Sequence, residues 1–184
     1  DVGVGRLLQQ SIAMVCTGGE ALVDESFVPA PEGDDVTARA FKATLAMEAA
    51  VQASDLDWVI LRGGLFYGPG TGFDDGWFAR AAAGTLRLPG DGAEFVSLVH
   101  IADMAAATLA AVEVWPSRQT LIVADDGPAR WREVFGYIAA VTGGAPPQPG
   151  GRGGFPSFRV SNRRARQALG WAPRYPDYRA GLIR

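Results

Sequence analysis

An alanine-rich stretch without glycine or proline lies between two apolar segments, and this arrangement most constrains the fold. The helix-favouring stretch runs from Val36 to about Ala53, and the apolar segments cover Arg6 to Val15 and Asp57 to Arg62. A glycine-rich loop, LRGGLFYGPGTGF at 61–73, takes in the end of the second segment. Strand, helix, strand and loop in this order are typical of a parallel sheet covered by helices. The pattern predicts an α/β fold.

The remaining sequence continues this alternation. We predict helices at 76–83, 101–113, 129–141 and 161–170, strands at 94–100 and 119–124, and a flexible Pro/Gly-rich connection at 143–154. Asp34 or Asp35 is expected to cap the helix that starts at Val36, and Asp103 to cap or brace the helix that starts at Ile101.

Composition excludes several classes of protein. With 184 residues, 48% hydrophobic and 20% charged, the chain has the balance of a globular protein, and no apolar run approaches the roughly 20 residues of a membrane span. The net charge of −3 gives no general basis for binding nucleic acid. Single Cys16 and single His100 rule out a disulfide framework and any metal site needing several such ligands. We predict a cytoplasmic protein without a nucleic-acid, membrane or metal partner.

Three separated stretches carry a recognisable pattern. WVILRGGLFYGPG at 58–70 resembles a strand followed by an "RPxxxYGPG" loop, GDG at 90–92 with SLVHIAD at 97–103 resembles "GDG…vHvxD", and SNRRARQALGWAP at 161–173 resembles "SNxrxxxxLGWxP". In this order and spacing they resemble the extended short-chain dehydrogenase/reductase group, the NAD-dependent epimerase/dehydratase family.

The resemblance implies a partial Rossmann-like parallel sheet flanked by helices, plus a small α/β C-terminal substrate-side region. Residues 1–70 would form the C-terminal half of an NAD(P)-binding domain, and 71–184 a substrate-side region interleaved with the last Rossmann elements. The glycine turn that holds the cofactor pyrophosphate has no counterpart in the sequence. The expected cofactor is NAD or NADP if the natural protein has an N-terminal half that supplies this turn, and none otherwise.

The family's hydride-transfer enzymes use a tyrosine as general acid/base, with a lysine four residues later on the same helix face. The chain has one lysine, Lys42, and Ala38 stands four residues before it. The family also has a glutamate four residues after its lysine, and Glu48 matches that position. In this alignment Ala40 and Thr44 replace the tyrosine and the lysine, so the catalytic pair is degenerate.

A catalytic hydroxyl is missing from its usual position as well. QSIAMVC at 10–16 resembles "SSAxVY", which places Ile12 at the hydroxyl position and Ser11 one residue earlier. Neighbouring residues of a strand face opposite sides, so Ser11 reaches a site only where the strand bulges. Ser11 is the remaining candidate for a catalytic residue.

The glycine-rich loop supplies the predicted cofactor wall. By the resemblance, Gly63, Gly64, Leu65 and Phe66 would line the nicotinamide end, mostly through backbone atoms. Tyr67 would lie on the substrate side.

An arginine that pairs with the substrate diphosphate in sugar-nucleotide members is replaced by Val96, which disfavours a nucleotide sugar. Arg87 or Arg80 could take over anion binding, and we place Arg87 on the substrate side. Buried Arg62 needs a partner for its charge, for which we predict Glu48.

Two functions follow. The first is an NAD(P)-binding, epimerase/dehydratase-like or reductase-like protein that acts on a small carbonyl or hydroxyl compound through a degenerate Tyr-x-x-x-Lys site. The alternative is a non-catalytic scaffold or interaction protein that keeps the fold, with a homodimer or a partner chain completing the sheet.

Overall fold

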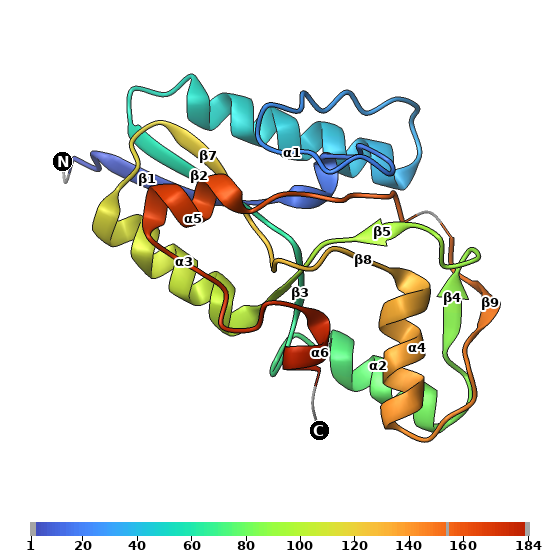
Figure 1. Cartoon of the computed structure of the whole chain (residues 1–184). Helices are drawn as coiled ribbons and strands as arrows, with labels where there is room; N and C mark the ends of the chain where they lie inside the picture. The colour runs from blue at the N-terminus through green and yellow to red at the C-terminus, as the bar shows by residue number, and fades with distance from the viewer. Residues whose placement is uncertain (1–2, 154, 183–184) are drawn as a thin grey trace.

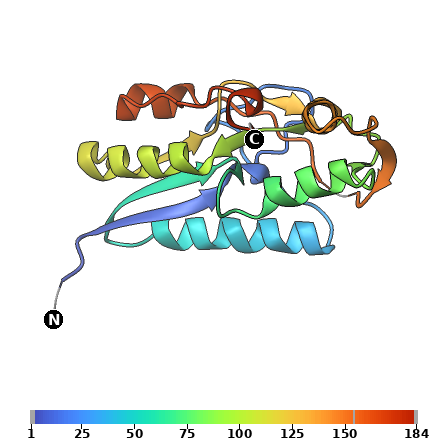
Figure 2. The ribbon, with the colours of Figure 1, turned by 90° about the horizontal axis from the view of Figure 1, so that it is seen from below.

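The computed structural model describes residues 3–153 and 155–182, and its centre is a parallel sheet. The strands β1 (Arg6–Ile12), β2 (Asp57–Gly63) and β7 (Gln119–Val123) lie in the order β1-β2-β7. Helix α1 (Val36–Gln52) covers one face, and α3 (Ile101–Val114) and α5 (Arg163–Leu169) cover the other (Figures 1 and 2). The predicted parallel sheet flanked by helices is confirmed.

Alternation along β2 explains why both faces are covered. Val51, Trp58 and Ile60 form one buried cluster on the α1 side. Val59 and Leu61 belong to a second buried cluster that includes residues of α3 and α5. A strand that buries both of its faces reads as a continuous apolar run, as 58–61 does.

The other half of the chain is built from short strand pairs and two packed helices. These elements are β3 (Leu65–Tyr67) with β6 (Leu98–His100), β4 (Arg87–Pro89) with β9 (Gln148–Gly151), β5 (Phe95–Val96) with β8 (Ala129–Arg130), the helices α2 (Phe73–Ala82), α4 (Trp131–Val141) and α6 (Tyr178–Gly181), and a 3₁₀ turn at Ala13–Val15. Figure 1 shows α2, α4, β4 and β9 gathered on the side away from the parallel sheet.

The predicted single strand at 94–100 is wrong, because the segment splits at Ser97. The two halves pair with different partners, β5 with β8 and β6 with β3. Ser97 is fully buried between them, where its hydroxyl donates to the Phe158 carbonyl at 3.2 Å and accepts from the Val160 N–H at 3.0 Å. The segment therefore binds the returning C-terminal chain at the point of the split.

The predicted flexible connection at 143–154 contains β9, which pairs in parallel with β4. Gly151 lies so close to β4 that an added Cβ would approach the carbonyl oxygens of Leu88 and Arg87 to 2.8 and 2.9 Å. Glycine at residue 151 thus allows β9 to pair closely with β4, and this part of the segment is a paired strand instead of a flexible connection. Gly154 lies outside the described residues.

Helix boundaries also differ in places. Helix α2 starts at Phe73 instead of residue 76, and α4 starts at Trp131 because Ala129 and Arg130 pair with β5. At the N-terminus of α1 the cap is Asp35, which accepts from the Ala38 N–H at 2.8 Å, as one of the two predicted caps.

Of the two predicted roles for Asp103, capping or bracing α3, the structure shows the bracing role. The side chain of His100 occupies the cap position and accepts from the Ala102 N–H at 3.1 Å. Asp103 instead accepts from the backbone N–H groups of Arg174 and Tyr175, both at 2.9 Å. It braces the helix against the C-terminal segment.

A buried ion pair joins α1 to the carboxyl end of β2, as predicted for Arg62 and Glu48. Their closest atoms, Nη2 and Oε2, are 2.6 Å apart, and Nε donates to Oε1 at 2.9 Å. The Ser11 hydroxyl donates to the same Oε1 at 2.5 Å. Arg62, Ser11 and Glu48 are at most 7% exposed, so one carboxylate holds two strands and a helix together.

No helix in the described part of the chain is long and apolar enough to cross a membrane.

We predict that Glu48→Gln lowers the free energy of unfolding by about 3–5 kcal/mol, because it leaves the Arg62 charge buried without a partner. Arg166→Gln, which breaks the exposed pair with Asp126, is the matched control and should cost about 0–1 kcal/mol. Urea unfolding monitored by circular dichroism measures both. Equal losses in the free energy of unfolding would show that burial does not make the Glu48–Arg62 pair more important to stability than the exposed pair.

Candidate active site

The glycine-rich loop lines a cavity beside the carboxyl ends of β1 and β2. We call it the glycine cavity; its volume is about 150 Å³, and its lining residues are Gln10, Ile12, Met14, Gly63, Gly64, Leu65, Phe66 and Phe73. In parallel sheets, ligands bind beyond the carboxyl ends of the strands. The structure thus brings together the four residues predicted to form a cofactor wall.

Close packing explains why two of the four predicted wall positions, 63 and 64, are glycine. A Cβ on Gly64 would lie 2.7 Å from the Ser97 carbonyl oxygen, and one on Gly63 would lie 2.6 Å from the ring of Phe66. The first contact is with backbone that pairs β3 to β6. The chain can turn from β2 into β3 at this distance only without a side chain at residue 64.

The strand flip expected between Ser11 and Ile12 is present. Ile12 lines the glycine cavity, while Ser11 faces α1 and donates its hydroxyl to Glu48. The usual hydroxyl position is therefore occupied by an apolar side chain. Ser11 does not line the cavity, and its hydroxyl donates its hydrogen bond to the buried Glu48 carboxylate.

Ala40 and Thr44 lie four residues apart on one side of α1, and neither lines the glycine cavity. Thr44 donates its hydroxyl to the Ala40 carbonyl at 3.0 Å, within the helix. Lys42 points elsewhere, because its Nζ donates to the carbonyl of Gly33 at 2.6 Å.

A larger cavity adjoins the glycine cavity and shares Leu65 and Phe73 with it. We call it the arginine cavity; it holds about 550 Å³ and is lined by Leu65, Gly72, Phe73, Trp77, Arg80, Thr85, Leu86, Arg87, Pro89, Trp131, Phe135, Gly151, Arg152 and Phe155. Arg87 and Arg80, the two arginines considered for anion binding, both line this cavity. Arg152 was missed because the sequence alone does not show that β9 returns beside β4.

Tyr67, the other predicted substrate-side residue, lies in the core. Its ring is 0% exposed, packs edge-on against His100 with ring centres 5.2 Å apart, and directs its hydroxyl toward the Asp177 carbonyl at 3.4 Å. Burial also raises its pKa above the ordinary tyrosine value, so the phenol stays protonated. In this arrangement Tyr67 supports the C-terminal segment instead of facing a cavity.

His100 is a packed residue, as predicted. Its Nδ1 accepts a hydrogen bond from the Ala102 N–H, and its ring stacks on Tyr175 with centres 3.9 Å apart. Burial lowers its pKa, which keeps the imidazole neutral at physiological pH.

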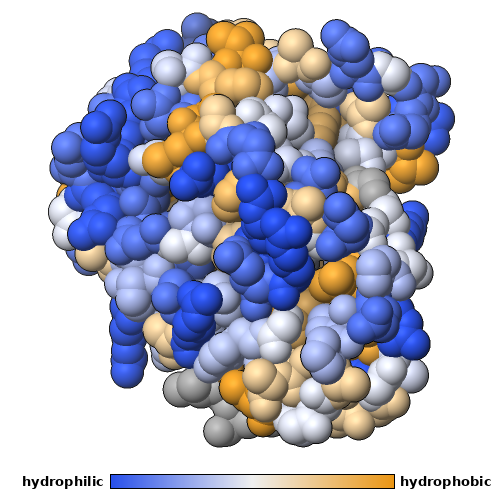
Figure 3. All heavy atoms as spheres, turned by 45° about the vertical axis from the view of Figure 1, so that its right-hand side comes forward, coloured by the Kyte–Doolittle hydropathy of each residue, from blue (hydrophilic) through white to orange (hydrophobic). Residues whose placement is uncertain are grey.

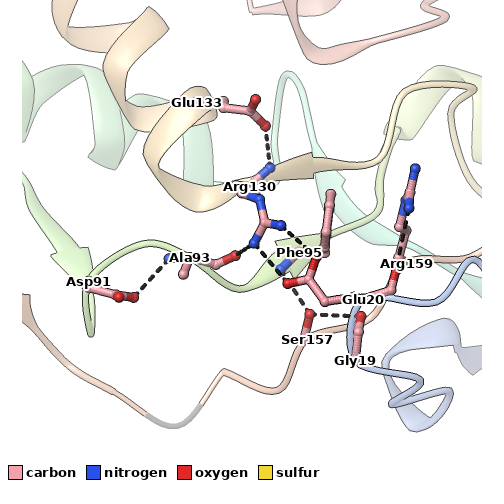
Figure 4. A network of polar contacts seen from close by, with 9 residues as sticks. All are labelled: Gly19, Glu20, Asp91, Ala93, Phe95, Arg130, Glu133, Ser157 and Arg159. Carbon is pink, nitrogen blue, oxygen red and sulfur yellow. Dashed lines mark hydrogen bonds and ion pairs between the residues drawn. The ribbon is translucent and has the colours of Figure 1, made fainter.

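A polar network fixes the chain that carries Phe155 to the arginine cavity (Figure 4). The Phe95 N–H donates to the Ser157 hydroxyl at 3.0 Å, and the Phe95 ring lies under the guanidinium of Arg130 at 4.3 Å. Arg130 also pairs with Glu20 at 2.5 Å. The network links segments that are more than a hundred residues apart, and so holds the rim in place.

Asp125, which no sequence signal identified, is a buried carboxyl with a raised pKa. It follows β7 and is 1% exposed, and Oδ2 has no hydrogen-bond partner among the described residues. Burial raises its pKa to about 8 against the effect of the Gly127 N–H, and the charges of Asp177, Asp126 and Asp103 raise it further. Asp125 is therefore protonated in the folded protein at neutral pH.

Within residues 3–153 and 155–182, no three His, Cys, Asp or Glu side chains lie close enough to hold a metal ion.

Comparison with known proteins shows which proteins this chain is similar to. The profile of the NAD dependent epimerase/dehydratase family matches residues 39–123. A "3-diazoavenalumate denitrifying reductase" from a Streptomyces species is 37% identical over 201 aligned positions, which include 99% of this chain and 65% of the relative. The chain thus spans about two thirds of the length of that relative.

Solved structures share the fold. MoeE5 in complex with UDP-glucuronic acid and NAD superimposes with a TM-score of 0.77 at 23% identity, over 98% of this chain and 63% of that chain. UDP-glucose 4-epimerase from Thermotoga maritima with UDP-glucose gives 0.77 at 21% identity, over 98% and 62%. At these identities the likeness establishes the architecture alone.

Gly64→Ala should destabilise the protein, because the new Cβ would meet the Ser97 carbonyl and push β3 away from β6. We expect a loss of about 1–3 kcal/mol, as for overpacking in a core. Gly136→Ala is the matched control: nothing lies within 4 Å of an added Cβ in α4, so it should stabilise by about 0.5–1 kcal/mol. Thermal unfolding distinguishes them, and a neutral Gly64→Ala would contradict the close approach.

Stability should fall as the pH rises from about 4 to about 8, because over that range folded Asp125 keeps a proton that the unfolded chain has lost. The sign follows from a folded pKa above the unfolded one, and the slope is at most about 1.4 kcal/mol per pH unit. Asp125→Asn should remove this slope, whereas exposed Asp75→Asn should not. Urea titrations at several pH values measure it; an unchanged slope in Asp125→Asn would refute the assignment.

Proposed function

We propose that this chain, which is similar to the NAD dependent epimerase/dehydratase family over residues 39–123, forms part of an NAD(P)-binding reductase that delivers hydride without donating a proton. When bound, the nicotinamide supplies the hydride. In this proposal Gly63, Gly64, Leu65 and Phe66 hold the nicotinamide end at the glycine cavity.

The fit of the nicotinamide rests on the chemistry of the lining. The eight lining residues carry no charge, and glycine backbone and the Phe66 ring offer a flat wall. Gln10 supplies an amide that can hydrogen-bond a carboxamide. These features suit a planar, neutral ring end.

The observation that carries the proposal is the absence of a proton-transfer group from this cavity. Among the described residues that line it, none is Asp, Glu, His, Cys, Lys, Tyr, Ser or Thr. Reduction of a carbonyl leaves an alkoxide that an acid must protonate, which is the role of the family's tyrosine. A small carbonyl or hydroxyl substrate therefore suits this site less well than an acceptor that needs hydride alone.

A diazo compound in its diazonium form is such an acceptor. Hydride forms a new C–H bond, the C–N bond breaks with its electron pair, and the pair leaves in N₂, so charge and atoms balance without a proton. The name of the Streptomyces relative specifies a diazo substrate and a denitrifying reduction. We therefore propose a diazo compound as the substrate class of this chain.

Isotope labelling of the product tests this function in the natural full-length protein. With deuterated NADPH in ordinary water, the new C–H bond of the reduced diazo compound should carry deuterium; with ordinary NADPH in heavy water, it should carry none. Mass spectrometry reads both. Deuterium from the solvent would overturn direct hydride delivery, and the lack of any NAD or NADP binding by calorimetry would favour the non-catalytic alternative.

A further inference from the structure

We propose that the arginine cavity binds the substrate of this reductase as a planar aromatic carboxylate, with Arg80, Arg87 and Arg152 as its anion-binding groups. The inference rests on the proposed function for the identity of the reaction, but it concerns a separate set of residues and a binding event that needs no cofactor.

The first support is a connected aromatic wall. Trp77 lies edge-on to Trp131 with ring centres 5.9 Å apart, and both contact Phe135, at 5.5 and 5.1 Å. Phe73 packs on Trp77 at 6.0 Å, and Phe155 packs on Trp131 at 5.2 Å. All five rings line the cavity. Rings held by one another form a rigid apolar surface on which a planar ligand can stack.

The second support is unbalanced positive charge. Three arginines and no acidic residue line the cavity. None of the three forms an ion pair with a residue that the structure describes. Arginines that lack protein anions next to an apolar wall are suited to a carboxylate, which they can bind through two parallel hydrogen bonds.

Arg87 is oriented for this task by its own loop. Its Nη1 donates to the carbonyls of Gly84 and Leu86 at 3.0 and 3.1 Å. These bonds fix one edge of the guanidinium and leave Nε and Nη2 without a partner in the described chain. A fixed guanidinium loses less side-chain entropy when it binds an anion.

The two cavities adjoin, so the aromatic ring of a ligand bound in the arginine cavity could reach the glycine cavity, where the proposed reaction takes place. Leu65 and Phe73 belong to both cavities, so a ring stacked on the aromatic wall lies next to the glycine cavity. The carboxylate would point away from the glycine cavity, toward Arg87 on β4 and Arg152, which directly follows β9.

The exterior around this half of the molecule favours a small molecule over a protein partner. On the face shown in Figure 3, hydrophobic atoms form separate small areas among hydrophilic ones. A stable protein interface needs a broader continuous surface than these areas provide.

Calorimetric titration with naphthoate, without cofactor, tests the inference. We expect naphthoate to bind, and naphthylmethanol, which lacks the carboxylate, and decahydronaphthoate, which lacks the planar ring, to bind at least about tenfold more weakly. UDP-glucose is the competing probe. Tighter binding of UDP-glucose, or equal binding of the three naphthalene compounds, would overturn the proposal.

Variants locate the site. Arg87→Gln and Arg80→Gln should each weaken naphthoate binding about tenfold, while Arg164→Gln, at an exposed position of α5 outside the cavity, should leave it within about twofold. Far-ultraviolet circular dichroism and the melting temperature confirm that each variant is folded. No change in either cavity variant would overturn the inference.

The result is independent of the hydride assay. Binding of naphthoate without hydride transfer would support the cavity assignment and remove the proposed reaction, and hydride transfer without naphthoate binding would do the reverse.

Discussion

The buried ion pair between Glu48 and Arg62 is the constraint on which the rest of the site depends. It fixes α1 against the carboxyl end of β2, and the same carboxylate accepts a hydrogen bond from the hydroxyl of Ser11 on β1. Charges removed from water in this way are held only when every polar atom is matched. Because Arg62 faces α1, the next residue, Gly63, faces the opposite side and begins the wall of the glycine cavity. The ion pair therefore sets the direction of the loop that follows.

The sequence was informative where the signal is local or repeats along one element. Strand β2, helix α1 and the partner of Arg62 were predicted correctly because apolar runs, helix propensity and an unpaired buried charge each have one ready solution. Prediction failed where distant segments meet. The split at Ser97 and the pairing of β9 with β4 depend on where the C-terminal chain returns, as does the place of Arg152. The alternation of apolar residues and the spacing of motifs along the sequence do not show where the C-terminal chain returns.

The two cavities divide the chemical work in the proposed reaction. The glycine cavity is uncharged and contains no acid or base in its lining, so it suits hydride delivery to an electron-poor centre. The arginine cavity combines aromatic rings packed on one another with guanidinium groups that form no ion pair among the described residues, so it suits recognition of an anion. In this proposal, the predicted replacement of tyrosine and lysine by Ala40 and Thr44 accompanies a change of chemistry rather than a loss of it. A substrate that expels N₂ supplies the driving force and needs no catalytic acid.

The most direct test of this account is the single-turnover rate of hydride transfer to a diazo substrate, measured by stopped flow in water and in heavy water. If no proton moves in the transition state, the solvent isotope effect should be about 1, and the rate should not follow the pKa of any protein group. A solvent isotope effect of about 2 or more, with a rate that titrates with pH, would contradict it by showing that the protein donates a proton in the rate-limiting step.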